Sequence, residues 1–127
     1  MVERSLPARA ADEVVVAVRA AGINPSDVKN VLGSFPHTSV PRVPGHDFAG
    51  VVTDGPAELI GQAVWGGSGE GFGFSRDGCH AQYVSVPVSA IAPKPDTLSY
   101  AAATCGVPYI TAWDALERSQ WWPELAC

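Results

Sequence analysis

The sequence predicts a mainly β domain, built as an antiparallel, turn-rich sheet with a few short helices. Three observations lead to this fold class. The chain has 127 residues, enough for one domain with a core of ordinary size. Its 13 glycines and 11 prolines suit short strands joined by tight turns. Valines alternate at positions 14, 16 and 18, as they do on the buried face of a strand.

Four segments carry strand patterns. They are residues 13–20, 48–53, 62–65 and 79–86. Within the second of these, Gly50 removes a side chain, which predicts a bulge or the close approach of another backbone. Three prolines between residues 35 and 44 predict an extended surface loop. Five glycines between residues 66 and 73 predict a flexible loop, because no phosphate-binding spacing and no following helix can be traced there.

Three short helices are expected. Asn24 and Pro25 form a typical helix start, with the amide at the N-cap and proline in the first helical position, and Gly33 follows the helix end. Ser99 is expected to cap a second helix over residues 100–105. Gly106 and Pro108 then interrupt the pattern, so a third helix is expected over residues 110–118.

Composition excludes several classes of function. The net charge is −5 and only two lysines are present, which disfavours nucleic-acid binding. No run of about 18 apolar residues and no basic segment before an apolar core is found, so neither a membrane span nor a signal peptide is expected. The three cysteines form no C-x-x-C motif and predict neither a disulfide framework nor a structural zinc site. A reducing, cytoplasmic compartment is therefore expected.

Four sequence blocks carry a family resemblance. Residues 44–52, PGHDFAGVV, resemble the G-H-E/D-x-x-G-x-V block of the medium-chain dehydrogenase/reductase superfamily. Upstream, AAGINPSD at 20–27 resembles the A-x-G-I/V-N-P-x-D segment of its zinc-independent, quinone oxidoreductase-like branch. Downstream, residues 78–84 and 111–116 resemble the G-x-x-A-E-Y and L-T-A-W-x-A-L blocks of that branch.

The resemblance implies an incomplete GroES-like antiparallel β-barrel, the N-terminal catalytic domain of the family. It places a loose lead-in at residues 1–12, the domain at residues 13–118, and a tail at residues 119–127 where the Rossmann domain would begin. The glycine-rich turn that receives a cofactor pyrophosphate is not found in the chain. Binding of NADP(H) and hydride transfer are therefore not expected of this chain alone.

The resemblance assigns catalytic roles to Asn24, Lys29 and His46. The Asn24 amide would face the nicotinamide and polarise a substrate carbonyl, although an N-cap role explains it equally well. Lys29 would stabilise a developing enolate, or is a solvated surface charge. His46 keeps one ligand position of the zinc-dependent branch or makes a structural hydrogen bond. Because Asn24 replaces a zinc-binding cysteine, no catalytic zinc is expected.

Further residues have two interpretations each. Thr111 would lie near the cofactor nicotinamide by resemblance, or it caps a helix. Phe35 would form an apolar wall against a flat substrate, or it anchors its loop. Asp47 is expected to orient the surroundings of His46 rather than to act as a base. Cys105 lies near the family's third zinc-ligand position and is interpreted as a small buried hydrophobe.

The chain is thus expected to be the catalytic-domain portion of an NADPH-dependent oxidoreductase that acts on a quinone, an enone or a related small carbonyl compound. A different class of function is a non-catalytic interaction module or a truncated gene product. A third reading is a fragment of a zinc-dependent alcohol dehydrogenase, which Asn24 opposes. Trp65 and Trp113 are expected in the core. Apolar surface near the last helix and Trp121–Trp122 is expected to be uncovered, which favours self-association.

Overall fold

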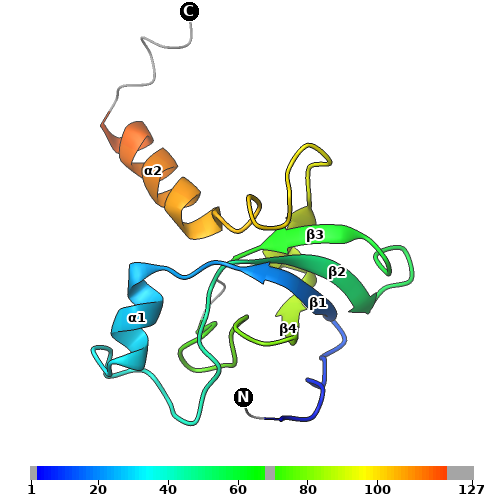
Figure 1. The fold of residues 1–127 in the computed structure, drawn as a ribbon, viewed down its shortest axis with the longest axis horizontal. Coiled ribbons are helices and arrows are strands. Elements are labelled where there is room, and N and C mark those ends of the chain that lie inside the picture. The colour runs from blue at the N-terminus through cyan, green and yellow to red at the C-terminus, as the bar shows by residue number, and fades with distance from the viewer. Residues whose placement is uncertain (1–2, 68–70, 120–127) are drawn as a thin grey trace, which may run out of the picture.

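Five strands form one curled antiparallel sheet in the computed structural model, which describes residues 3–67 and 71–119. Helix α1 lies at one end of this half-barrel, and helix α2 extends away from it (Figure 1). The elements are β1 (Glu13–Ala21), α1 (Pro25–Val31), β2 (Phe48–Asp54), β3 (Ala63–Gly66), β4 (Tyr83–Pro87), a 3-10 turn (Val88–Ala90), β5 (Ile91–Pro93) and α2 (Gly106–Arg118). The mainly β fold class is confirmed.

The strand order is β4-β1-β2-β3-β5, so that β2 occupies the centre of the sheet. In the register, Val16 of β1 lies opposite Val52 of β2, and Gly50 of β2 lies opposite Val64 of β3. β5 was not predicted; it is three residues long and pairs with β3. Strand β2 therefore has a neighbouring strand on each side. The site residues that directly precede β2 are thereby held near the middle of the molecule.

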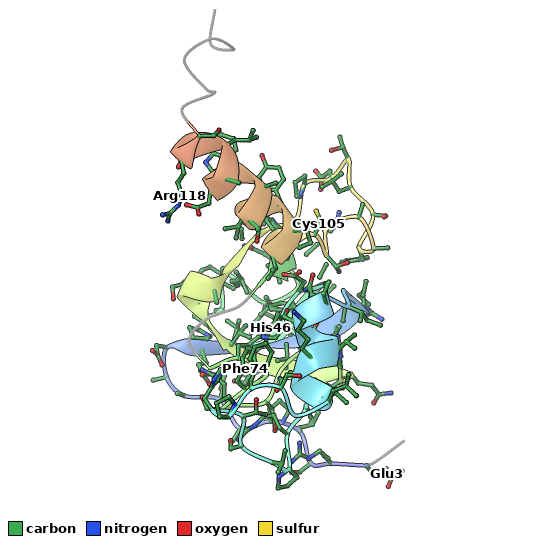
Figure 2. All side chains as sticks on the ribbon, turned by 90° about the vertical axis from the view of Figure 1, so that its left-hand side faces the viewer. Glu3, His46, Phe74, Cys105 and Arg118 are labelled. Atoms are coloured by element: carbon green, nitrogen blue, oxygen red, sulfur yellow. The ribbon has the colours of Figure 1, made fainter. Side chains whose placement is uncertain are left out.

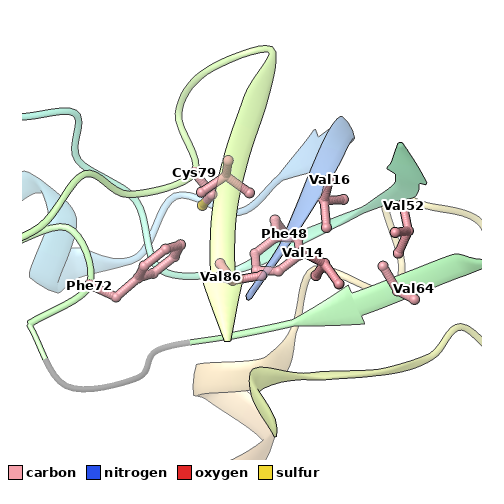
Figure 3. Close-up of a cluster of buried hydrophobic side chains, with 9 residues drawn as sticks. Val14, Val16, Phe48, Val52, Val64, Phe72, Cys79 and Val86 are labelled. Carbon is pink, nitrogen blue, oxygen red and sulfur yellow. The ribbon is translucent and has the colours of Figure 1, made fainter. Parts of the chain in front are cut away.

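The core packs against the sheet and is built from apolar side chains of β1–β4 and of the loop between β3 and β4 (Figure 3). Its members are Val14, Val16, Phe48, Val52, Val64, Phe72, Cys79, Val84 and Val86. Val14 and Val16 are fully buried, as the alternation in the sequence predicts. Phe48 fills the largest buried volume at the start of β2. Hydrophobic burial around this phenylalanine thus fixes the strand that follows His46 and Asp47.

The predicted strand over residues 79–86 is too long at its N-terminal end. Strand β4 begins only at Tyr83, because the backbone N–H groups of Cys79 and His80 bond to the turn before β2 instead of to a strand. The Cys79 N–H donates to the Gly45 carbonyl at 3.3 Å, and the His80 N–H donates to the Pro44 carbonyl at 3.0 Å. These bonds hold Cys79 beneath the entrance of β2 instead of in the sheet.

The expectations for the C-terminal helices are also corrected. Residues 100–105 form turns and no helix, although the Ser99 hydroxyl does accept a hydrogen bond from the Ala102 N–H at 3.1 Å. Helix α2 begins at Gly106, four residues earlier than expected, and includes Pro108. Proline is tolerated there because the first N–H groups of a helix have no acceptor within the helix.

Trp113 lies on the exposed surface of α2 and not in the core, since 38% of its surface is accessible. Trp65 in β3 is half-buried. Trp121 and Trp122 lie outside the described residues. Within residues 3–67 and 71–119, neither helix is long and apolar enough to cross a membrane.

Candidate functional site

Three segments meet at one end of the sheet: the connection from β1 to α1, the entrance of β2, and the start of α2. The Gly22 N–H donates to the Asp47 carbonyl at 2.9 Å, and the Val107 N–H donates to Asp47 Oδ1 at 3.0 Å. Four buried polar side chains gather at this junction. We call them the amide–carboxylate cluster: Asn24, Asp27, His46 and Asp47.

Asp47 connects the other parts of the junction. Its side chain is fully buried, and Oδ2 accepts a hydrogen bond from Asn24 Nδ2 at 2.8 Å. The same carboxylate accepts the backbone N–H of Val107, so it caps the N-terminus of α2, where the helix dipole favours a negative charge. A buried carboxylate is costly unless it is hydrogen-bonded in this way. The Asn24 amide is thereby held in one orientation.

Asp27 holds the histidine of the cluster. It lies in the first turn of α1, where Oδ2 accepts the Asn24 backbone N–H at 2.7 Å, as in a capping box. Its Oδ1 contacts His46 Nδ1, and both side chains are buried. Asp47 was expected to orient the surroundings of His46, but the carboxylate that contacts the His46 ring is that of Asp27. Among the described residues, no hydrogen-bond partner reaches His46 Nε2.

Aromatic rings lead from the cluster towards the loop after α1. The His46 and Phe74 ring centres are 4.8 Å apart, and Figure 2 shows both side chains beside α1. Phe74 packs edge-to-face against Phe35 with ring centres 5.3 Å apart. Phe35 is half-buried, so this series of rings runs from the partly exposed loop to buried His46. Tilted and edge-to-face rings of this kind provide an apolar surface for another flat group.

The structure brings only some of the predicted site residues together. Asn24 and His46 share the cluster, and Phe35 reaches it through Phe74. Lys29 is exposed on α1, and the described residues give it no hydrogen bond or ion pair to the cluster. Thr111 is exposed in the middle of α2 and does not cap it; its hydroxyl donates to the Val107 carbonyl at 2.8 Å. The catalytic and binding roles of these residues stay predictions.

The donor groups do not fit a zinc ion. The described residues contain no group of three or more His, Cys, Asp or Glu side chains arranged to hold a metal. The thiolate is the form that binds zinc, yet burial, reinforced by the carboxylates of Asp27 and Asp47, raises the pKa of Cys79 to about 12. The Cys79 thiol instead donates to the Asp47 carbonyl at 3.2 Å. Cys105, expected to be buried, is exposed.

The two described cysteines are predicted to differ in reactivity. In a Cys127→Ser background treated with iodoacetamide at about pH 8, Cys105 is expected to be alkylated at least about 100-fold faster than Cys79, because only the thiolate reacts and Cys79 is buried with a raised pKa. Peptide mass spectrometry over time measures both rates. In urea the two rates are expected to converge. Equal rates in the folded protein would contradict the buried placement of Cys79.

Sequence reasoning missed two residues of this site, Asp27 and Phe74. Asp27 could have been found, because an acidic residue three positions after an Asn N-cap is the pattern of a capping box. Phe74 carried no signal. It lies between Gly73 and Ser75 in a turn-rich loop, and its contacts with Phe35 and His46 join segments far apart in the sequence.

Comparison with known proteins gives a consistent result. The model of the alcohol dehydrogenase GroES-like domain matches residues 10–96. A zinc-type alcohol dehydrogenase-like protein of Schizosaccharomyces pombe is 45% identical over 109 residues, which are 85% of this chain and 34% of that protein. The chloroplastic NADPH-dependent alkenal/one oxidoreductase of Arabidopsis thaliana is 34% identical over 119 residues, 86% of this chain and 31% of that protein.

Solved structures agree with the fold. The quinone oxidoreductase from Coxiella burnetii superimposes with a TM-score of 0.80 at 27% identity, covering 94% of this chain and 40% of that one. The GroES-like fold expected from the sequence is therefore confirmed. The chain spans about a third of the length of the curated relatives it matches.

Proposed function

Because the chain belongs to the alcohol dehydrogenase GroES-like domain family, we propose that it forms the substrate side of a hydride-transfer site that reduces a quinone or an α,β-unsaturated carbonyl compound with NADPH. One observation carries the proposal: a buried amide, Asn24, is fixed by a buried carboxylate at the junction of α1, β2 and α2. Relatives named as alkenal/one and quinone oxidoreductases support the substrate class.

The proposed role of Asn24 is to bind the substrate oxygen. The side-chain amide has two N–H groups, and one of them donates to Asp47 at 2.8 Å. The second N–H then donates to a carbonyl oxygen, where negative charge develops during reduction. Asp47 keeps the amide from rotating, so little reorganisation is needed when the charge forms. NADPH, when bound, supplies the hydride.

The aromatic side chains are proposed to set the shape of the site. Phe35 and Phe74 offer flat apolar surface close to the cluster, which suits a planar, conjugated substrate more than a branched aliphatic alcohol. Lys29, exposed on α1, is proposed to lie near the substrate oxygen only when the substrate is bound. Asp27 contacts His46, and the His46 ring packs against Phe74. These two residues are therefore proposed to orient the aromatic surface.

The chain alone is proposed to be inactive, because a dinucleotide-binding domain is needed to hold NADPH. The G-x-G-x-x-G spacing of a phosphate-binding turn cannot be traced in the sequence. We expect no saturable NADPH binding at about millimolar cofactor, measured by calorimetry or by quenching of the four tryptophans. Saturable binding in the micromolar range would contradict this and assign a cofactor site to the chain itself.

A domain fusion tests the catalytic proposal. Residues 1–118 are joined to the cofactor-binding domain of a quinone oxidoreductase relative, and oxidation of NADPH is followed with a quinone and with an enone. The fusion is expected to reduce both, and Asn24→Ala is expected to lower kcat about 100-fold, as loss of one oxyanion donor does. Thr53→Val is the matched control, because Thr53 lies near the end of β2 farthest from the cluster and its hydroxyl donates to the Val15 carbonyl.

The second candidate is a non-catalytic interaction module, favoured by the exposed apolar side chains of α2. It predicts a folded fusion that binds NADPH but oxidises none, with the Asn24→Ala variant indistinguishable from it. A zinc-dependent dehydrogenase is the third candidate, suggested by the name of the Schizosaccharomyces pombe relative and opposed by the donor groups described above. It predicts that the fusion's activity depends on added zinc and is lost with a chelator.

A further inference from the structure

Asn30 is a buried polar residue outside the amide–carboxylate cluster. It lies in α1, and only 5% of its surface is accessible. Its side-chain Nδ2 donates to the Gly73 carbonyl at 2.7 Å, and its Oδ1 accepts the Thr38 hydroxyl at 2.5 Å. Both polar atoms of the side chain therefore have a partner, as burial of an amide requires. We call these two hydrogen bonds the Asn30 bridge.

The Asn30 bridge joins two loops that are far apart in the sequence. Thr38 belongs to the proline-rich loop after α1, and Gly73 belongs to the glycine-rich loop between β3 and β4. Gly73 has a φ of 74°, and a Cβ built there would lie 3.0 Å from a backbone oxygen of the turn before β2. The Ser39 N–H also donates to the Phe74 carbonyl at 3.1 Å. The two loops are thus held against each other and against the entrance of β2.

Each loop carries aromatic rings next to its contact with Asn30. Phe35 and His37 lie in the first loop, and Phe74 follows Gly73 in the second. The ring centres are 5.6 Å apart for Phe35 and His37, 5.3 Å for Phe35 and Phe74, and 5.0 Å for His37 and Phe74. Phe35 and Phe74 are half-buried and His37 is exposed, so part of this group of rings is accessible. We call these three residues the ring triplet.

We propose that Asn30 is a positioning residue. Its bridge holds the ring triplet in place before a substrate binds, and the triplet then binds a planar quinone of two or more fused rings. The substrate class rests on the proposed function and narrows it. Because neighbouring ring centres are at least 5.0 Å apart, a ligand that contacts several rings at once must extend beyond one of them. A fused-ring quinone does this, whereas a short, linear alkenal does not.

The physical reason for a bridge is the cost of ordering two loops. Rings on separate loops provide a binding surface only while both loops hold their relative positions. If the loops moved independently, part of the binding energy would be spent on ordering them. The two hydrogen bonds of Asn30 supply that order in advance, from a helix that is itself fixed to the cluster through Asp27.

Binding is measured on the complete chain without cofactor, by NMR titration with anthraquinone-2-sulfonate between about 0.1 and about 5 mM. This planar quinone has no free ring position for addition of a thiol, so the exposed Cys105 does not react with it. The wild-type chain is expected to bind it with a Kd of about 1 mM and to show shifted ring resonances of the triplet. Cyclohexanesulfonate has the same charge but no aromatic ring, and no binding is expected.

Three variants test the bridge. Asn30→Ala removes both hydrogen bonds and is expected to weaken probe binding about 10-fold, the effect of losing the contact with one ring. Thr38→Val removes one hydrogen bond, and about a 3-fold loss is expected. Thr38→Ser keeps the hydroxyl and is expected to bind within about 2-fold of the wild type. Thr53→Val is the matched control for the valine variant, because its hydroxyl donates to the Val15 carbonyl in the sheet. It is expected to bind normally.

A second readout follows the rings themselves. Nuclear Overhauser effects between the ring protons of Phe74 and those of Phe35 and His37 are expected in the wild type and in Thr38→Ser, and are expected to weaken in Asn30→Ala. Circular dichroism and urea unfolding show whether each variant is folded. If Asn30→Ala does not fold, the comparison of Thr38→Val with Thr38→Ser still tests the hydrogen bond.

Two outcomes would overturn the inference. Undiminished probe binding by folded Asn30→Ala or Thr38→Val would show that the bridge does not position the rings. A wild-type chain that does not bind the probe, or that binds cyclohexanesulfonate equally well, would show that the ring triplet is not a quinone surface. Failure of the proposed function gives a different result: the chain binds the probe through the ring triplet, but the domain fusion oxidises no NADPH with a quinone.

Discussion

Asp47→Ala is expected to lower the free energy of unfolding by about 4 kcal/mol. The substitution leaves two donors without their acceptor, the Asn24 side-chain amide and the Val107 backbone N–H. Each unsatisfied buried donor costs about 1–3 kcal/mol, and the loss of the helix cap removes the favourable charge at the N-terminus of α2. Urea unfolding followed by tryptophan fluorescence and by circular dichroism measures the effect.

Two comparisons make this prediction specific. Asp47→Asn keeps the shape and one acceptor oxygen but removes the charge, so about half of the loss is expected. Asp54→Ala removes an exposed carboxylate that pairs with Arg9 at 3.0 Å, and a change below about 1 kcal/mol is expected. An Asp47→Ala protein as stable as Asp54→Ala would mean that the carboxylate does not join the three segments.

Gly50→Ala is expected to cost about 3 kcal/mol, the upper end of the range for overpacking, because β2 is the central strand. A Cβ at this position would lie 2.2 Å from the Ala17 carbonyl oxygen and 2.8 Å from Val16 Cγ1, both on β1. Neither strand can move away freely, since β1 also pairs with β4 and β2 with β3. Thermal unfolding is expected to show the lowered stability.

Gly33→Ala serves as the matched control for a glycine substitution. Gly33 adopts a positive φ of 77° after α1, and nothing lies within 4 Å of a Cβ built there. Only the left-handed backbone conformation is then penalised, at about 1 kcal/mol. If Gly50→Ala and Gly33→Ala lost equal stability, this result would contradict the close approach of β1 to β2 at Gly50.

Local patterns were sufficient for much of the sheet. The alternation of Val14, Val16 and Val18 predicts β1, and Gly50 predicts the close backbone contact that the structure places there. The register of β1 against β2 shifts between Val18 and Ala20, beside the partner of Gly50. Such features depend on neighbours along one strand and on its period of two, which a sequence displays directly.

The C-terminal region could not be predicted in the same way, because its structure depends on distant contacts. A start of α2 at Gly106, with Pro108 in the first turn, requires an acceptor for the Val107 N–H, and Asp47 provides it from 60 positions away. Without knowledge of that contact, Gly106 and Pro108 indicate an interruption. The same contact explains why Thr111, expected at a helix start, lies inside the helix.

The residues that form the candidate site were easier to predict from the sequence than the contacts between them. Asn24 and His46 lie together, as the resemblance implies. However, Asp47, which was expected to orient the surroundings of His46, pairs with Asn24, and His46 contacts Asp27 instead. Asp27 is near Asn24 in sequence and carried a recognisable capping pattern. The pairing of Phe35 with Phe74 joins two loops across 39 positions, and only the folded chain brings them together.

The two outer strands of the sheet have features that oppose edge-to-edge pairing between copies of this chain. Within the part of the chain that the structure describes, β4 and β5 each pair on one side only, so their other sides could recruit a strand from another molecule and start aggregation. Both strands are short, and each ends in a proline, Pro87 and Pro93, which has no N–H to offer. The half-barrel can thus stay open along both sides without growing into a continuous intermolecular sheet.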